Sequence, residues 1–244
     1  MAYEGSELVG EVAELNEKLR DASPQEILRA AIERYGDKLA LVSSFGSESA
    51  VLLHMAAQID PNIAVLFLDT GMLFGQTLDY RQRLSAQLGL TNVRDLRPQY
   101  QDLAIHDPAA DLWKTDTDAC CNIRKVLPLD RALEGYEGWI TGRKRFQGGE
   151  RMRLKVVEQG ESQVKFNPLA NWSKEQLDAY AAEHDLPAHP LVEFGYPSIG
   201  CWPCTKPVEA GQDIRAGRWA GQDKTECGIH LPHAASAVQV GGDI

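Results

Sequence analysis

The sequence predicts an α/β fold in which helices flank a parallel sheet. Three stretches carry this prediction: the apolar runs 39–42 and 63–68, and the run 138–142, which ends in glycine. Polar loops follow the first two runs, and each loop leads into a segment with apolar residues at helical spacing. Strand, loop and helix repeated in this order are typical of parallel strands joined by crossover helices.

Capping signals and apolar spacing predict where the helices lie. The first helix is expected over 7–20, where leucine and valine recur on one face. The next opens with the capping box Ser23-Pro24-Gln25-Glu26 and closes at Gly36. Further helices are expected over 50–57, over 78–88 with Gly89 as the stop, after an N-cap at Asp116 or Asp118, and from Ser173 to about His184.

Composition and charge limit the partners of the chain. The 244 residues are 43% hydrophobic, which is ample for a core. A formal net charge of −10 argues against general binding to nucleic acid or to membrane surfaces, because both are polyanionic. The longest apolar runs are shorter than the ~18–20 residues of a membrane span. The first residues lack a signal peptide, so we expect a cytoplasmic location.

Two polar loops are candidate ligand sites, because ligands of parallel sheets bind at the carboxyl ends of the strands. The loop 43–49 holds Ser43, Ser44, Gly46 and Glu48 directly before a helix, where backbone N–H groups and hydroxyls could bind an anion. An ordinary serine-capped turn is the alternative. Asp69 ends the next strand and is either a turn residue or an acceptor for a ribose or base.

The five cysteines form a pattern of their own. Cys120 and Cys121 are adjacent, Cys201 and Cys204 form a C-x-x-C pair, and Cys227 stands alone. Inert buried cysteines are one interpretation. Two disulfides are another, which reduced cytosolic thiols make weaker. The pairing favours a four-ligand metal site and one reactive thiol.

Ligand spacing discriminates between zinc and an iron–sulfur cluster. Structural zinc is held by C-x(2–4)-C hooks, and the pair Cys201 and Cys204 has that spacing. Adjacent side chains such as Cys120 and Cys121 diverge, so they reach two points of a larger object more readily than one ion. An iron–sulfur cluster, with a separate iron for each thiolate, is therefore favoured over zinc.

Basic residues gather in an otherwise acidic chain. Residues 143–155 hold six basic side chains and one acid, with glycines between them, as in a loop that wraps a phosphate-like group. Arg124 and Lys125 follow the cysteine pair within one turn. Solvated surface is the alternative for both. His230, three residues after Cys227, is either functional or an ordinary surface histidine.

Four motifs give the chain a resemblance to a known family. They are Ser44-Phe45-Gly46-Ser47-Glu48-Ser49, Leu68-Asp69-Thr70-Gly71, Cys120-Cys121-x-x-Arg124-Lys125 with Cys201-x-x-Cys204, and Glu226-Cys227-Gly228-Ile229-His230. Over residues 25–232 the chain resembles the assimilatory, thioredoxin-dependent adenosine 5′-phosphosulfate reductases of the phosphoadenosine phosphosulfate reductase family. The phosphoadenylyl-sulfate branch shares the terminal motif but lacks both cysteine pairs.

The resemblance implies an adenine-nucleotide α-hydrolase-like fold, related to the PP-loop enzymes, with a mobile C-terminal tail. It also implies a [4Fe–4S] cluster on Cys120, Cys121, Cys201 and Cys204. The implied substrate-binding residues are Ser43, Ser44, Phe45, Gly46, Glu48, Leu66, Asp69, Lys125, Gly142, Arg151, Arg215, Arg218 and His230, with the phosphosulfate assigned to Lys125 and the three arginines. The expected domains are an N-terminal helix over 1–22, a nucleotide- and cluster-binding domain over 23–205, and a segment over 206–244 that carries the nucleophile.

The resemblance also implies a mechanism. Cys227 attacks the sulfo group, AMP leaves, and an S-sulfocysteine forms on the enzyme. The sequence has no sixth cysteine, so thioredoxin or glutaredoxin is the expected reductant that releases sulfite, in sulfate assimilation and cysteine biosynthesis. The oligomeric state stays open, and a homo-oligomer is one option.

Three other functions compete with this expectation. The first is a PP-loop ATP-dependent ligase or tRNA-thiolating enzyme, although Phe45 and Glu48 break the glycine-rich loop that such enzymes need. The second is a non-catalytic iron–sulfur redox sensor. The third is a reductase that accepts both adenosine phosphosulfate and its 3′-phosphorylated form.

Overall fold

The computed structural model describes residues 2–160, 162–222 and 224–230, and it confirms the α/β fold. Within these residues one sheet has the strand order β3-β2-β1-β4-β6-β5. The strands are β1 (Leu39–Ser43), β2 (Ala64–Leu68), β3 (Val93–Leu96), β4 (Gly138–Ile140), β5 (Val157–Gln159) and β6 (Val164–Phe166). All neighbours pair in parallel except β5 and β6, which form an antiparallel edge.

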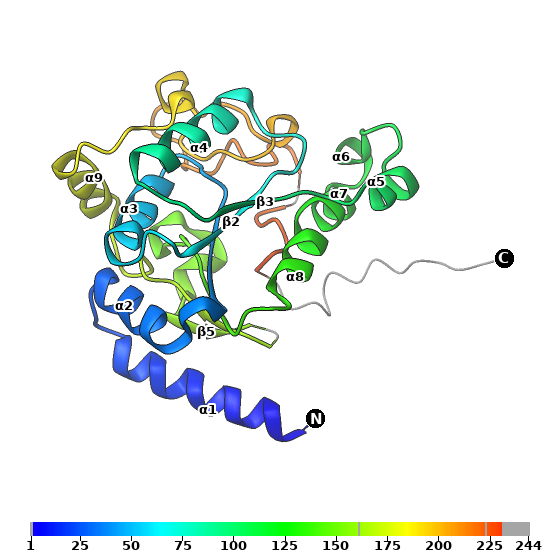
Figure 1. Cartoon of the computed structure of the whole chain (residues 1–244). Coiled ribbons are helices and arrows are strands. Elements are labelled where there is room, and N and C mark those ends of the chain that lie inside the picture. Colours follow the sequence, from blue (N-terminus) through cyan, green and yellow to red (C-terminus); the bar gives the residue numbers. More distant parts are fainter. Residues whose placement is uncertain (1, 161, 223, 231–244) are drawn as a thin grey trace.

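Helices cover both faces of this sheet (Figure 1). The helices are α1 (Ala2–Leu19), α2 (Pro24–Tyr35), α3 (Ser49–Ile59), α4 (Gly75–Gln87), α5 (Tyr100–His106), α6 (Leu112–Thr115), α7 (Thr117–Cys121), α8 (Leu127–Leu133) and α9 (Lys174–Glu183). Alternate residues of β1 face opposite sides: Leu39 and Leu41 pack with α2, α3 and α4, whereas Ala40 and Val42 pack with α8. None of the described helices is long and apolar enough to cross a membrane.

The expected helix boundaries are largely confirmed. Ser23 caps α2 through both halves of its capping box, and Ser173 does the same for α9. Gly36 and Gly89 adopt positive φ of 50° and 66° where the preceding helices end, a conformation that costs glycine little. Asp116, rather than Asp118, caps α7 by accepting a hydrogen bond from Ala119 N at 2.8 Å.

Two features differ from what the sequence predicts. The cysteine pair ends α7, and the chain continues through a π-helical stretch (Asn122–Val126) into α8. The sheet also has strands that the sequence pattern did not indicate. β3 is a half-exposed edge strand that contains Arg94 and Asp95, and β5 and β6 have only three residues each, so none of them shows a distinct apolar run.

The region after Cys204 has little regular structure. A bridge between Thr205 and Arg218 closes a loop. Residues 224–230 then run beside α8 (Figure 1), where Ile229 packs against the core cluster that contains Leu129 and Leu133. We refer to residues 224–230 as the Cys227 segment. The part of the expected mobile tail that falls on 231–244 lies outside the described residues.

Candidate active site

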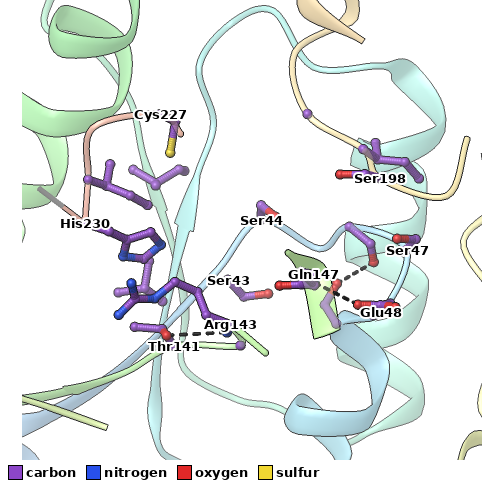
Figure 2. Close-up of a pocket in the computed structure, with 18 of the residues that line it drawn as sticks. Ser43, Ser44, Ser47, Glu48, Thr141, Arg143, Gln147, Ser198, Cys227 and His230 are labelled. Carbon is purple, nitrogen blue, oxygen red and sulfur yellow. Dashed lines mark hydrogen bonds between the residues drawn. The ribbon is translucent and has the colours of Figure 1, made fainter. Parts of the chain in front are cut away.

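A cavity of ≈ 210 Å³ lies at the carboxyl ends of β1, β2 and β4. Its walls come from the loop after β1, the start of α3, the loop after β4, residues 198–201, and the Cys227 segment. Figure 2 shows Cys227 and His230 on one side of this space and Ser47 and Glu48 on the other. The position agrees with the general placement of ligands in parallel sheets.

The loop after β1 is held in place by its own contacts. Phe45 has a φ of 48°, its N–H donates to Ser43 Oγ at 3.1 Å, and its buried ring packs edge-on against Phe67. Ser47 Oγ donates to the carbonyl of Pro197 at 2.6 Å. Phe45 therefore anchors the loop from the core, outside the lining of the cavity, whereas Ser43, Ser44 and Gly46 line it.

Glu48 also lines the cavity, but its carboxylate is engaged. Glu48 Oε2 accepts from Lys144 Nζ and from Gln147 Nε2, both at 2.9 Å. Burial lowers the pKa of Lys144, and Glu48 opposes that change. The carboxylate thus ties the start of α3 to the loop after β4, which also contributes Gly142 to the lining.

Leu66 and Asp69 lie behind the lining. Leu66 is buried in the core between the sheet and α8. Asp69 accepts from Gly71 N at 3.1 Å and from Arg97 Nε at 2.9 Å, so its carboxylate shapes the turn after β2. The neighbouring Leu68 and Thr70 line the cavity instead.

The four cations that were expected to bind a phosphosulfate all line the cavity: Lys125, Arg151, Arg215 and Arg218. Arg218 donates to the carbonyl of Ile199 at 3.3 Å and lies over the Trp219 ring. Burial, together with the charge of Arg151, lowers the pKa of Arg215 to about 10. Burial alone would lower the pKa of Lys125. The sulfurs of Cys201, Cys121 and Cys227 have the opposite and larger effect, so the pKa of Lys125 is raised.

Glu226 also lines the cavity, although the sequence analysis did not place it there. Its carboxylate accepts from Arg151 Nε and Nη2 at 2.5 and 2.8 Å, and Arg215 Nη2 lies 3.6 Å away. These contacts outweigh burial and lower the pKa of Glu226. The sequence did contain a signal for this role: Glu226 is an acid directly beside the lone cysteine, in a chain with two arginine-rich stretches.

Cys227 is half-buried and lines the cavity. Gly228 follows with a φ of 88°, and a Cβ there would lie 3.3 Å from Val126. His230 stacks on Trp139 at 5.8 Å, and its buried Nδ1 has no hydrogen-bond partner among the described residues. Burial, together with the charges of Arg143 and Lys165, holds the pKa of His230 well below its usual value.

The other cysteines form what we call the cysteine group: Cys120, Cys121, Cys201 and Cys204. The first three are buried and the fourth is half-buried. Burial raises the pKa of Cys120 to about 12, and it also raises the pKa of Cys121 and Cys204. The thiols lie close enough to raise one another's pKa as well. No three ligand-type side chains in the described chain converge as they do on a single metal ion.

Hydrogen bonds and an ion pair fix the surroundings of the cysteine group. Thr70 Oγ1 lies 3.2 Å from Cys201 Sγ, and Lys125 Nζ lies 3.8 Å from Cys121 Sγ. Arg124 donates to the carbonyl of Thr70 at 3.0 Å and to Asp107 at 2.6 Å, and both members of this ion pair are buried. The cysteine pair on α7 and the loop that carries Cys201 are thereby linked through the turn after β2.

Comparisons with known proteins agree with this geometry. Residues 38–207 match the family model "phosphoadenosine phosphosulfate reductase domain". The chain is 49% identical to an adenosine 5′-phosphosulfate reductase of Chelativorans sp. (strain BNC1), over 91% of each chain. It is 46% identical to a phosphoadenosine 5′-phosphosulfate reductase of Gloeobacter violaceus, over 86% of this chain and 89% of that protein.

Solved structures agree as well. The crystal structure of the phosphoadenylyl-sulfate reductase from Candida auris, a phosphate complex, has a TM-score of 0.68 and 30% identity over 81% of this chain and 96% of that one. Yeast FAD synthetase shares the fold alone, with a TM-score of 0.51 and 14% identity over 83% of this chain and 76% of that one. These neighbours confirm the adenine-nucleotide α-hydrolase-like fold that the family resemblance implied.

Proposed function

The chain belongs to the phosphoadenosine phosphosulfate reductase family, and from this premise we propose that it reduces adenosine 5′-phosphosulfate to sulfite and AMP in sulfate assimilation, toward cysteine biosynthesis. One observation carries the proposal: a half-buried thiol, Cys227, shares a cavity with several arginines and two lysines at the carboxyl ends of the strands. A thiol nucleophile and a cluster of cations are what attack on an anionic sulfo group requires.

In the first step the Cys227 thiolate attacks the sulfur of the sulfo group. A new S–S bond forms, the S–O bond to the phosphate breaks, and AMP leaves with the electron pair of that bond. The product on the enzyme is an S-sulfocysteine. Lys125, Arg151, Arg215 and Arg218 neutralise the charge that develops on the phosphosulfate, because all four line the cavity.

The second step needs a reductant from outside the chain. The other four cysteines form the cysteine group, so no further thiol is left to resolve the intermediate. A dithiol protein, thioredoxin or glutaredoxin, attacks Cys227 Sγ and releases sulfite, and its second thiol then resolves the mixed disulfide. Free thiols of this kind suit a cytoplasmic location. The nucleophile must meet substrate and partner in turn, so we propose that residues 206–244 include a segment that moves.

The nucleotide is proposed to lie against the loop after β1 and Gly142. Ser43, Ser44, Gly46 and Glu48 surround the start of α3, where N–H groups and the helix dipole favour an anion. Phe45, Leu66 and Asp69 support this surface from behind, and His230 bounds it on the side of Cys227. The residues 23–205 would then form the nucleotide- and cluster-binding unit, preceded by the helix in 1–22.

The cysteine group fits a [4Fe–4S] cluster. Each of the four thiols lies within electrostatic reach of at least two of the others. Their burial disfavours free thiolates, and Lys125 and Arg124 lie beside them. Metal ligation offsets the cost of forming buried thiolates, and a cluster offers each sulfur its own iron. When bound, such a cluster would act structurally and electrostatically close to Lys125 and would not supply electrons to the reaction. In this arrangement Thr70 orients Cys201, and Arg124 fixes the turn that carries Thr70.

A second candidate is a reductase of dual specificity. The relative from Gloeobacter violaceus, at 46% identity, carries the name of a phosphoadenosine 5′-phosphosulfate reductase. Such an enzyme would use the same thiol chemistry and would differ only in its tolerance of a 3′-phosphate.

The experiment is sulfite release by anaerobically purified protein, given thioredoxin and either substrate. Sulfite from adenosine 5′-phosphosulfate, with little from its 3′-phosphorylated form, is the expected result. Comparable rates with both would establish dual specificity. A colourless protein that releases no sulfite from either substrate would overturn both the reaction and the cluster.

A further inference from the structure

Glu226 joins the segment of the nucleophile to the cations of the cavity. Its carboxylate takes two hydrogen bonds from Arg151 and lies 3.6 Å from Arg215. Arg215 Nη2 also donates to the carbonyl of Thr225 at 2.8 Å. The side chains of Glu226 and Arg151 are both only 12% exposed. Both arginines therefore hold the backbone or side chain of the residues next to Cys227.

The cations that line the cavity differ in how far they are already neutralised. Lys144 is paired with Glu48, and Arg143 with Glu158. Arg151 and Arg215 are paired with Glu226. In the described chain no ion pair joins Lys125 or Arg218 to a carboxylate. An incoming anion therefore finds two cations without a carboxylate partner, Lys125 and Arg218, and two that share the single negative charge of Glu226.

The donors of Arg151 are also occupied. Nε and Nη2 point to Glu226, and Nη1 donates to Gln147 Oε1. A phosphate or sulfo group that binds the Nε and Nη2 donors of Arg151 must replace the carboxylate of Glu226, because two anions at one half-buried guanidinium repel each other. Replacement at Arg151 removes the ion pair that holds Glu226, and with it a contact that fixes Cys227.

We propose that Glu226 is a displaceable internal anion: it holds the Cys227 segment against Arg151 and Arg215 in the empty site, and the phosphosulfate of the substrate exchanges with it. This inference rests on the proposed function, since it takes the substrate to be an adenosine phosphosulfate. When the phosphosulfate replaces Glu226 at the arginines, the Cys227 segment is released and the Cys227 thiol can move toward the bound sulfo group. Glu226 is thus a positioning residue that links anion binding to the placement of Cys227.

The test compares Glu226→Gln with the wild type. Gln keeps the shape of the side chain and removes its charge, so the variant should bind adenosine 5′-phosphosulfate about tenfold more tightly. Binding is measured by calorimetry in a Cys227→Ser background, which prevents turnover. Neutral adenosine should bind to both proteins with the same affinity. A general disturbance of the site would change the affinity for both ligands, so an effect confined to the anion would exclude it. Glu209→Gln, at an exposed position, removes one charge elsewhere and should change neither affinity.

A second measurement needs no substrate, so it stays informative if the proposed reaction is wrong. Cys227 of the wild type and of Glu226→Gln is alkylated with iodoacetamide, and mass spectrometry locates the adduct. The variant should react several-fold faster, because the segment has lost its ion pair. Arg215→Gln should also speed alkylation, but it should weaken binding of the phosphosulfate. Unchanged alkylation in Glu226→Gln would overturn the tether, and unchanged or weaker binding of the anion would overturn the exchange.

Discussion

The cysteine group and the Cys227 segment are built in different ways. The cysteine group lies on α7 and on the 201–204 turn. Arg124, which is paired with buried Asp107, links the two because it donates to the carbonyl of Thr70, whose hydroxyl lies 3.2 Å from Cys201 Sγ. The Cys227 segment, in contrast, has no helix or strand and is held by side-chain contacts, among them Glu226 with Arg151 and His230 with Trp139. Under the proposed mechanism the site holds an anion and then admits a protein partner, and this difference suits both steps. We call the cysteine group and its surroundings the fixed wall and the Cys227 segment the releasable wall.

The strongest test of this difference is Cys227→Ser. Loss of the thiolate removes the nucleophile, so sulfite release should fall by at least about a thousandfold. Adenosine 5′-phosphosulfate should still bind, and the iron content should stay at the wild-type level, because Cys227 lies on the releasable wall. Activity within tenfold of the wild type would contradict the assigned role.

The fixed wall is tested by Asp107→Asn. This change leaves the Arg124 charge buried without its counter-ion, since only 6% of the Arg124 side chain and 1% of the Asp107 side chain are exposed. Removing one partner of a buried pair typically costs about 3–5 kcal/mol, so the free energy of unfolding in urea should fall by about that amount. Metal content should fall with it.

The matched control is Asp102→Asn, which breaks the more exposed pair between Asp102 on α5 and Arg131 on α8. Pairs of this kind are worth about 0–1 kcal/mol, so the control should unfold nearly like the wild type. Equal effects of the two changes would show that the buried pair has no special part in the fixed wall.

The sequence predicted the central strands and the helix starts better than the contacts that build the two walls. The strands β1, β2 and β4 and the capping boxes at Ser23 and Ser173 were readable because each depends on neighbouring residues. The pairing of Glu226 with Arg151 joins residues 75 positions apart, and no local pattern encodes it. The same holds for the buried pair Arg124–Asp107, whose members both look like surface charges in the sequence.

The sequence did not predict the short strands β5 and β6, for another reason. β5 and β6 contain three residues each, and β6 includes a buried Lys165 that breaks the apolar run. Its burial is stabilised by tertiary contacts: Lys165 Nζ lies 4.9 Å over the Trp139 ring and 3.9 Å from Glu158. Burial and the charge of Arg143 lower the pKa of Lys165 to about 7. Such an environment exists only after the sheet has formed.

Acid should weaken the fixed wall through His189, which begins the 3-10 turn Pro190–Phe194 before Cys201. Nδ1 of this buried imidazole accepts from Leu191 N at 3.2 Å, and Nε2 lies 3.0 Å from Thr77 Oγ1, so the neutral ring is bound. Burial lowers the pKa of His189 to about 4. A lowered folded-state pKa means that the unfolded chain binds the proton first, and stability is lost as the pH falls from about 6.5 to about 4.

The loss attributable to His189 should reach about 3 kcal/mol at the acid end, since each pKa unit corresponds to ~1.4 kcal/mol. Urea unfolding of the wild type and of His189→Gln at several pH values measures it. The curve of the variant should be flatter by that amount between these pH values, whereas that of His106→Gln, at an exposed position, should follow the wild type. If the free energy of unfolding depended on pH in the same way for the wild type and for His189→Gln, protonation of His189 would not be the cause of the acid sensitivity.

The smallest effect is expected from Asp118→Asn, which breaks the ion pair between Asp118 on α7 and Lys224 of the Cys227 segment. This pair joins the two walls directly, as the Glu226 pair joins the segment to the arginines. Its carboxylate side chain, however, is 86% exposed, so water and salt screen the attraction, and exposed pairs contribute less than about 1 kcal/mol. Alkylation of Cys227 should therefore rise by no more than about twofold, well below the increase in Glu226→Gln. A larger rise in Asp118→Asn would show that the surface pair with Lys224, which salt alone could break, is what restrains Cys227. The pair of Glu226 with Arg151 inside the cavity, which only an anion that fits could displace, would then not be the main restraint.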